Sequence, residues 1–156
     1  MWPPDWSRRY CLERYPQKEA IPVIAKGHDL IACAQTGTGK TAAFSLPLIE
    51  RISKSHEKWR TTTVLILTPT RELAQQISDN INKYTKYLPV RNFAVYGGVN
   101  KDLQLKAIKK GVQILIATPG RLLDHLKKRS IDLSHINTLV LDEADRMLDM
   151  GFIRDI

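Results

Sequence analysis

The segment AQTGTGKT at residues 34–41 constrains the fold of this 156-residue chain more than any other feature. It matches the phosphate-binding fingerprint G-x-x-x-x-G-K-[ST], except that Ala34 stands at the first glycine position. Small residues in such a loop let backbone N–H groups surround phosphate oxygens at the start of a helix. Because an apolar run over 29–34 precedes the loop, the pattern predicts a strand, a phosphate loop and a helix in succession.

Two side chains of this loop are expected to act on a nucleotide. The Lys40 ammonium is placed to reach the β- and γ-phosphates of ATP, and the Thr41 hydroxyl to bind Mg²⁺. The remaining loop residues are predicted to bind the cofactor alongside them: Ala34, Gln35, Thr36, Gly37, Thr38 and Gly39. The alternative is a turn that happens to precede a lysine, and the flanking strand and helix patterns argue against it.

An acidic pair, Asp142 and Glu143, ends the apolar run at 138–142. Asp142 is placed to hold Mg²⁺ and to contact the nucleotide, and Glu143 to orient and deprotonate an attacking water. Such a pair alone could simply cap the next helix through its negative charge. Combined with the phosphate loop, it predicts ATP hydrolysis with Lys40, Asp142 and Glu143 as the catalytic residues.

Short apolar runs alternate with amphipathic segments from about residue 28 onward. Runs rich in Val, Ile and Leu are typical of strands buried on both faces of a parallel sheet. They are expected at 29–34, 62–68, 90–96, 112–117 and 138–142. Helical spacing of apolar residues is found at 71–88, 102–110 and 121–128. The alternation predicts an α/β fold with a mostly parallel, doubly wound sheet flanked by helices. Pro47 predicts a kink or a short helix after the phosphate loop.

Composition only partly limits the kinds of binding partner that this chain could have. A net charge of +8 favours a polyanion such as RNA or DNA, but a merely basic soluble protein fits equally well. The two cysteines, Cys11 and Cys33, have no metal-binding spacing, which indicates a reduced intracellular protein. No signal peptide is visible and the apolar runs are too short to span a bilayer, so we expect a cytoplasmic protein without a membrane partner. The four histidines are scattered, so surface or packing roles are expected.

Five segments occur in an order that resembles the DEAD-box RNA helicases: AQTGTGKT (34–41), PTRELA (69–74), GG (97–98), TPGR (118–121) and DEAD (142–145). Alanine at the first position of the phosphate loop is itself what this family shows. The resemblance covers about residues 17–156. It implies a RecA-like P-loop NTPase domain, the first of two in an RNA-unwinding motor that uses ATP and Mg²⁺. A DNA-directed motor of the same superfamily fits the motif spelling less well.

The resemblance further implies a surface for the RNA sugar-phosphate backbone. Its members are Pro69, Thr70, Arg71, Gly97, Gly98, Thr118, Pro119, Gly120 and Arg121. Amides at helix starts and arginine side chains bind phosphates without reading bases, which predicts weak sequence preference and strong salt dependence. Asp145 is expected to couple the ATP site to other motifs. Gln17 has the register of the family's adenine-reading glutamine, whose amide both donates and accepts.

The chain also departs from the family pattern. Residues 1–16 match nothing expected and are interpreted as an atypical leader before a partial RecA-like domain at 17–156. The family's next motif, a Ser-Ala-Thr strand, and its second RecA-like domain are absent, so the domain is expected to be incomplete at its C-terminus. An empty place in the sheet is then expected between 29–34 and 138–142, with marginal stability and poor hydrolysis. Two functions stay open: an RNA-dependent ATPase and helicase, or an inactive fragment that only binds ATP or RNA.

Overall fold

The computed structural model describes residues 16–35, 37–55 and 61–152. The chain divides into two compact units, one up to residue 55 and the other from residue 56. The predicted leader lies outside the described residues except for its last position, Pro16, which begins a helix. Within the described ranges, no helix is both long enough and apolar enough to cross a membrane.

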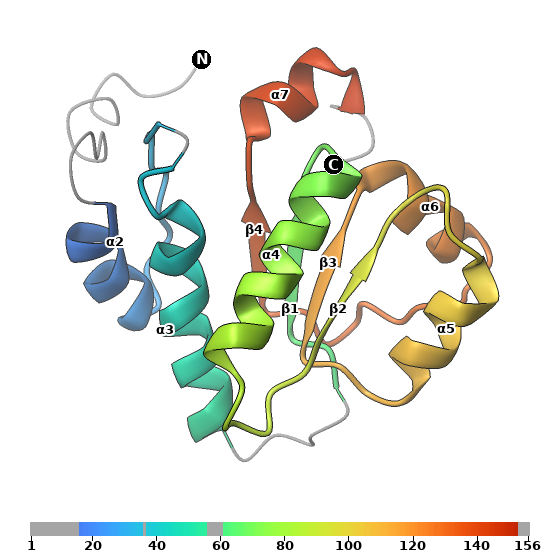
Figure 1. Cartoon of the computed structure of the whole chain (residues 1–156), viewed down its shortest axis with the longest axis horizontal. Coiled ribbons are helices and arrows are strands. Elements are labelled where there is room, and N and C mark those ends of the chain that lie inside the picture. The colour runs from blue at the N-terminus through green and yellow to red at the C-terminus, as the bar shows by residue number, and fades with distance from the viewer. Residues whose placement is uncertain (1–15, 36, 56–60, 153–156) are drawn as a thin grey trace. The chain divides into compact units, whose positions relative to one another are not determined.

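The N-terminal unit contains two helices, α2 (Pro16–Ala25) and α3 (Lys40–Lys54) (Figure 1). They pack against each other through the buried side chains of Ala20 and Ala43. The helix α3 is 15 residues long and includes Pro47, so of the two expectations for this proline the short helix is wrong, and the kink stays a prediction. Proline removes only one helical hydrogen bond, and the burial of neighbouring Leu48 and Ile49 offsets that loss.

The strand expected at 29–34 is a second correction. Within the described part of this unit the segment forms no strand, and only Cys33 makes a bridge of the β type. Its side chains are mostly exposed, including Ile31 at 46%. A strand is a member of a ladder of several successive hydrogen-bonded pairs, and the single bridge at Cys33 does not make one.

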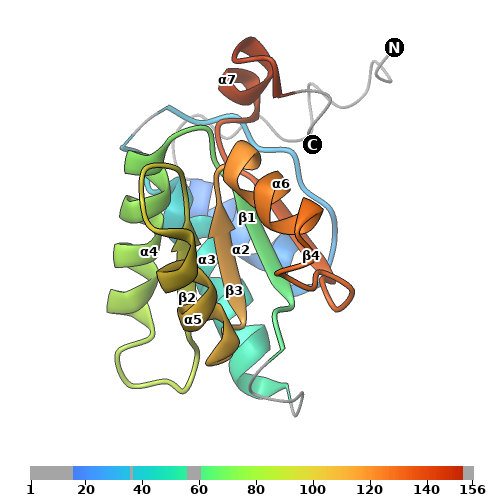
Figure 2. The ribbon, with the colours of Figure 1, turned by 90° about the vertical axis from the view of Figure 1, so that its right-hand side faces the viewer.

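The C-terminal unit is a four-stranded parallel sheet in the order β2-β3-β1-β4. Its strands are β1 (Val64–Leu67), β2 (Asn92–Val95), β3 (Ile114–Ala117) and β4 (Thr138–Leu141). The helices between and after them are α4 (Arg71–Tyr84), α5 (Lys101–Lys109), α6 (Pro119–Lys127) and α7 (Ala144–Asp149). Figure 2 shows α4 on one side of the sheet and α6 on the other. The predicted doubly wound, parallel α/β architecture is confirmed for this unit.

The core of this unit explains why its strands are so short and apolar. All four residues of β1 and of β3 are buried, as expected for central strands covered on both faces. One face packs Leu65, Leu67 and Leu115 against Leu122 of α6 and Met147 of α7. Each observed strand is shorter than the range predicted for it. The helix α4 likewise ends before the predicted residue 88.

The outer strand β4 is less protected than the centre. Leu139 is 52% exposed and Leu141 is 41% exposed, whereas the facing residues of β1 are buried. Within the described residues, β4 has a paired strand on one side alone. The sequence pattern of β4 therefore resembles that of a central strand, although its observed position is at an edge.

Candidate functional site

The phosphate loop is shaped by two glycines with left-handed backbone. Gly37 has φ +84° and Gly39 has φ +87°, a region that other residues rarely adopt. Gly39 is the N-cap of α3, and Lys40 is the first residue of that helix. The Thr38 hydroxyl donates to the Gln35 carbonyl at 2.7 Å and closes the loop on itself. Because glycine offers no side-chain cap, the first amides of α3 have no such acceptor and suit an anion.

Gln17 lies beside this loop. Its Nε2 is 3.5 Å from the Gly39 carbonyl oxygen, at the outer limit of a hydrogen bond. A Cβ added at Gly39 would stand 2.1 Å from the same nitrogen, so the Gln17 side chain would have to move, whereas the φ of +87° favours glycine there whatever the space. The structure thus places Gln17 next to the phosphate loop. Its role toward adenine stays a prediction, and Thr36 lies outside the described residues.

The acidic residues lie at the carboxyl end of β4, in the C-terminal unit. The Asp142 amide donates to the Leu67 carbonyl at 2.9 Å, which holds this end of β4 against β1. Glu143 has a left-handed backbone, with φ 52°, and is the N-cap residue of α7. Its carboxylate accepts from Arg146 at 3.2 Å and is largely buried. A non-glycine residue in this conformation carries strain, which is common at functional positions.

The predicted RNA-contact segments lie at the same edge of the sheet, because all four strands are parallel. Thr70 caps α4, its Oγ1 accepting from the Leu73 amide at 3.3 Å. The next residue, Arg71, places its guanidinium 5.3 Å from the centre of the Tyr96 ring. A Cβ on Gly98 would lie 3.4 Å from the same guanidinium. The PTRELA and GG segments therefore meet in space, with an exposed arginine between them.

The TPGR segment forms the start of α6. Thr118 is its N-cap residue without a side-chain cap bond, and Pro119 takes the first helical position, which its fixed φ suits. Gly120 is exposed. Arg121 turns inward: its side chain is 10% exposed, and its Nη1 donates to the Val99 carbonyl at 2.9 Å. The RNA contact of this arginine stays a prediction, and its Nη1 donates to acceptors within the protein.

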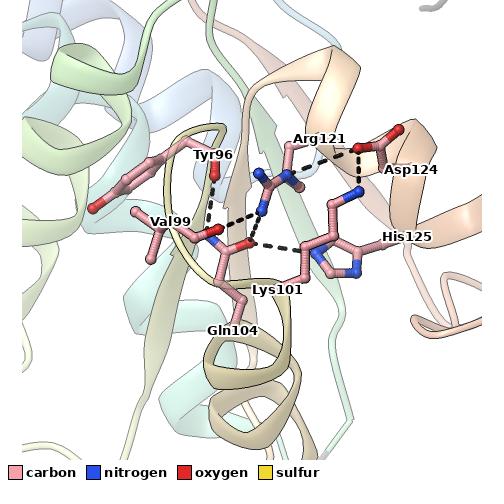
Figure 3. A network of polar contacts seen from close by, with 7 residues as sticks. All are labelled: Tyr96, Val99, Lys101, Gln104, Arg121, Asp124 and His125. Carbon is pink, nitrogen blue, oxygen red and sulfur yellow. Dashed lines mark hydrogen bonds and ion pairs between the residues drawn. The ribbon is translucent and has the colours of Figure 1, made fainter.

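A buried polar network joins α5 to α6 and was not predicted from the sequence (Figure 3). At its centre is Gln104, which is 2% exposed. Its Nε2 donates to the Tyr96 carbonyl at 3.0 Å, and its Oε1 accepts from Arg121 at 3.1 Å and lies 3.4 Å from the His125 Nε2. The available signal was its spacing: Gln104 comes four residues before the part-buried Ile108, on the packed face of α5.

Two ionisable groups of this network have displaced pKa values. The hydrogen bond from Lys101, 2.8 Å from Asp124, holds the pKa of that carboxyl below its usual value, and the positive charge of Lys101 adds to the effect. Burial lowers the pKa of His125, and the positive charges of Arg121 and Lys101 lower it further. His125 is buried between its neighbours, a packing role of the kind expected for a scattered histidine, and its surroundings disfavour the charged form.

Comparison with known proteins defines the family to which the chain belongs. The family model described as DEAD/DEAH box helicase matches residues 14–156, almost the whole chain. The chain belongs to the DEAD/DEAH box helicase family. A crystal structure of the yeast DEAD-box splicing factor Prp28 superposes with a TM-score of 0.82 at 34% identity, over 90% of this chain and 34% of that one. A hypothetical ATP-dependent RNA helicase from Sulfolobus tokodaii gives 0.81 at 37% identity, over 91% of this chain and 40% of that one. The RecA-like fold is thereby confirmed.

Relatives of known name are also similar over most of this chain. It is 52% identical over 141 residues to the ATP-dependent RNA helicase DeaD of Buchnera aphidicola, covering 90% of this chain and 23% of that protein. It is 53% identical over 140 residues to the DEAD-box ATP-dependent RNA helicase RhpA of Helicobacter pylori, covering 90% of this chain and 28% of that protein. The chain thus spans about a quarter of the length of these relatives.

Proposed function

We propose that this chain carries the ATP-binding part, and a portion of the RNA-binding surface, of an ATP-dependent RNA helicase. The observation that carries the proposal is the glycine-lined start of α3, where Lys40 follows a left-handed Gly39. Residues 17–156 are proposed to form part of the first RecA-like domain. The names of the similar proteins agree with this reading, and the cytoplasm, where ATP and RNA occur together, is the proposed location.

The residues present fit ATP with Mg²⁺. Gly37 and Gly39 open the loop so that the amides of residues 37–41 could face phosphate oxygens, and Lys40 would add a positive charge toward the β- and γ-phosphates. Thr41 and Asp142 would hold the metal, which commonly binds one or two protein oxygens together with phosphates. Gln17 would bind the adenine edge. Bound Mg²⁺ would neutralise charge that develops on the phosphates.

Glu143 is proposed as the residue that orients and deprotonates the attacking water. Its carboxylate is held by Arg146, so that contact must loosen or be shared when a water is bound. This contact favours a second candidate function, in which the chain binds ATP and RNA without turnover. Asp145, in the first turn of α7, is proposed to couple the ATP site to the RNA surface.

The RNA backbone is proposed to bind at the carboxyl edge of the sheet. Arg71 supplies an exposed cation, and the amides of the Gly97–Gly98 loop and of Thr118–Arg121 at the start of α6 supply neutral donors. Thr70 and Pro69 set the start of α4, as Pro119 sets the start of α6. Donors of this kind recognise phosphate and sugar, so the surface would bind many RNA sequences.

Substitution of Lys40 by alanine tests the nucleotide site. We expect Lys40→Ala to weaken binding of a fluorescent ATP analogue by at least about tenfold, since one charge-assisted contact contributes about 1.5–3 kcal/mol. Lys54→Ala is the matched control, because Lys54 ends the same helix and pairs with Glu50. We expect Glu143→Gln to bind ATP normally but to lose turnover.

The outcomes separate the two candidate functions. If wild-type chain binds ATP but hydrolyses none in the presence of single-stranded RNA, the binding function holds and the catalytic one does not. Equal ATP affinity in wild type and Lys40→Ala would contradict the phosphate loop assignment altogether.

A further inference from the structure

The Gly97–Gly98 loop is anchored at both of its ends by one buried network. Before the loop, the Tyr96 carbonyl accepts from the Gln104 Nε2 at 3.0 Å. After it, the Val99 carbonyl accepts from the Arg121 Nη1 at 2.9 Å. The same Nη1 donates to the Gln104 Oε1 at 3.1 Å, so a single amide side chain connects the two anchors (Figure 3).

The anchors also connect two separate elements of the proposed RNA surface. Gln104 lies on α5 and Arg121 in the first turn of α6, whose first amides have no side-chain cap. A second link between these helices runs from Lys101 to Asp124, at 2.8 Å. The loop amides and the α6 amides are thus held at one fixed spacing, and that spacing decides whether both can contact neighbouring phosphates of one strand.

We propose that Gln104 is a positioning residue for RNA binding, holding the Gly97–Gly98 loop and the start of α6 so that both contact the same sugar-phosphate backbone. Gln104 is 2% exposed and touches no RNA itself. Its effect passes through the Tyr96 carbonyl and Arg121. An amide is suited to this task, because it donates and accepts at once and carries no charge to compete with phosphate. The inference rests on the RNA binding proposed above.

The chain offers a matched control for this residue. Gln113 is also a buried glutamine of the C-terminal unit, 5% exposed, and its Oε1 accepts from the Arg91 amide at 2.8 Å. It stands just before β3, at the opposite edge of the sheet from Gly98. Replacing either glutamine by methionine removes a buried amide and leaves a side chain of similar size. Only the change at position 104 alters the loop anchors.

The test measures the affinity of the chain for a fluorescent single-stranded RNA at several salt concentrations. For Gln104→Met we expect binding about five- to tenfold weaker, and a slope of log affinity against log salt smaller by about one, because phosphate contacts are lost. A purely structural defect would reduce the fraction of active molecules without changing that slope. Gln113→Met should keep the wild-type slope.

A second variant guards against misfolding of the first. Gln104→Asn keeps a neutral amide but is one methylene too short to reach both anchors, so it should show the same loss of affinity and slope. If wild type binds RNA and both variants at position 104 keep its affinity and slope, the positioning role is refuted while the proposed function stands. If wild type itself binds no RNA, the proposed function fails, and the positioning role fails with it.

Discussion

At the scale of single residues, the network around Gln104 shows how a buried polar side chain is tolerated. Gln104 and His125 are almost fully buried. The Gln104 Nε2 donates to the Tyr96 carbonyl in the loop between β2 and α5. Its Oε1 accepts from Arg121 and lies 3.4 Å from the His125 Nε2 on α6. Burial without partners would cost several kcal/mol, so each member depends on the others. Arg121 likewise keeps its charge in a largely enclosed position through carbonyl and amide acceptors.

His125 predicts a pH dependence of stability. Because its pKa in the folded state lies below its ordinary value of 6.5, the unfolded state binds more protons as pH falls through that value. The free energy of unfolding should therefore decrease from about pH 7 to about pH 5.5, measured by urea denaturation. Asp124 does not contribute to this change between about pH 7 and about pH 5.5, because its lowered pKa makes it titrate at a more acidic pH.

The variant His125→Gln should lose much of this dependence, and His135→Gln, at an exposed position, should keep it. An identical pH dependence in wild type and His125→Gln would show that another group is responsible.

At the scale of the elements, capping explains where the helices of the RNA surface begin. The helix α4 starts at Thr70, whose hydroxyl accepts from the Leu73 amide. The helix α6 starts at Thr118, whose hydroxyl makes no such bond. Both helices have a threonine as N-cap residue, yet the threonine side chain of α4 accepts from a backbone amide and that of α6 does not. The first amides of α6 are thus left for an external acceptor.

This difference predicts unequal costs for two equivalent substitutions. Thr70→Ala should destabilise the chain by about 1 kcal/mol through loss of the cap, whereas Thr118→Ala should change stability by a few tenths at most. Urea denaturation of both variants beside wild type measures the difference. Equal losses would mean that the Thr70 hydroxyl contributes nothing beyond its packing.

At the scale of the whole molecule, the charge supports binding to a polyanion. The net charge of +8 arises from 24 Lys and Arg against 16 Asp and Glu. Charge alone fits any basic protein, but here an exposed arginine and an uncapped helix start gather at one edge of the sheet. An interface of this kind reads phosphate rather than bases.

We therefore expect RNA binding to depend strongly on salt and weakly on sequence. If about three phosphates are contacted, affinity should fall more than about tenfold between about 50 mM and about 200 mM salt. Single-stranded RNAs of equal length and different sequence should bind within a few-fold of one another, as measured by fluorescence anisotropy. A preference of a hundredfold for one sequence, or indifference to salt, would contradict a backbone interface.

The sequence by itself determined what depends on neighbouring residues. The glycine, lysine and threonine of the phosphate loop, the helix start at Arg71, and the apolar runs that become β1 to β4 follow from local pattern. Backbone conformation at Gly37 and Gly39, and apolar runs that must be buried, are set within a few residues.

Only the tertiary structure decided what depends on distant partners. The apolar run at 29–34 forms no regular strand, because a ladder needs a paired neighbour that the run cannot specify. Arg121 resembles an exposed phosphate-binding cation in the sequence, yet it lies against the Val99 carbonyl and Gln104. A buried hydrogen bond is formed only when both groups leave water together, so the residue that connects the loop to α6 could be recognised only in the folded chain.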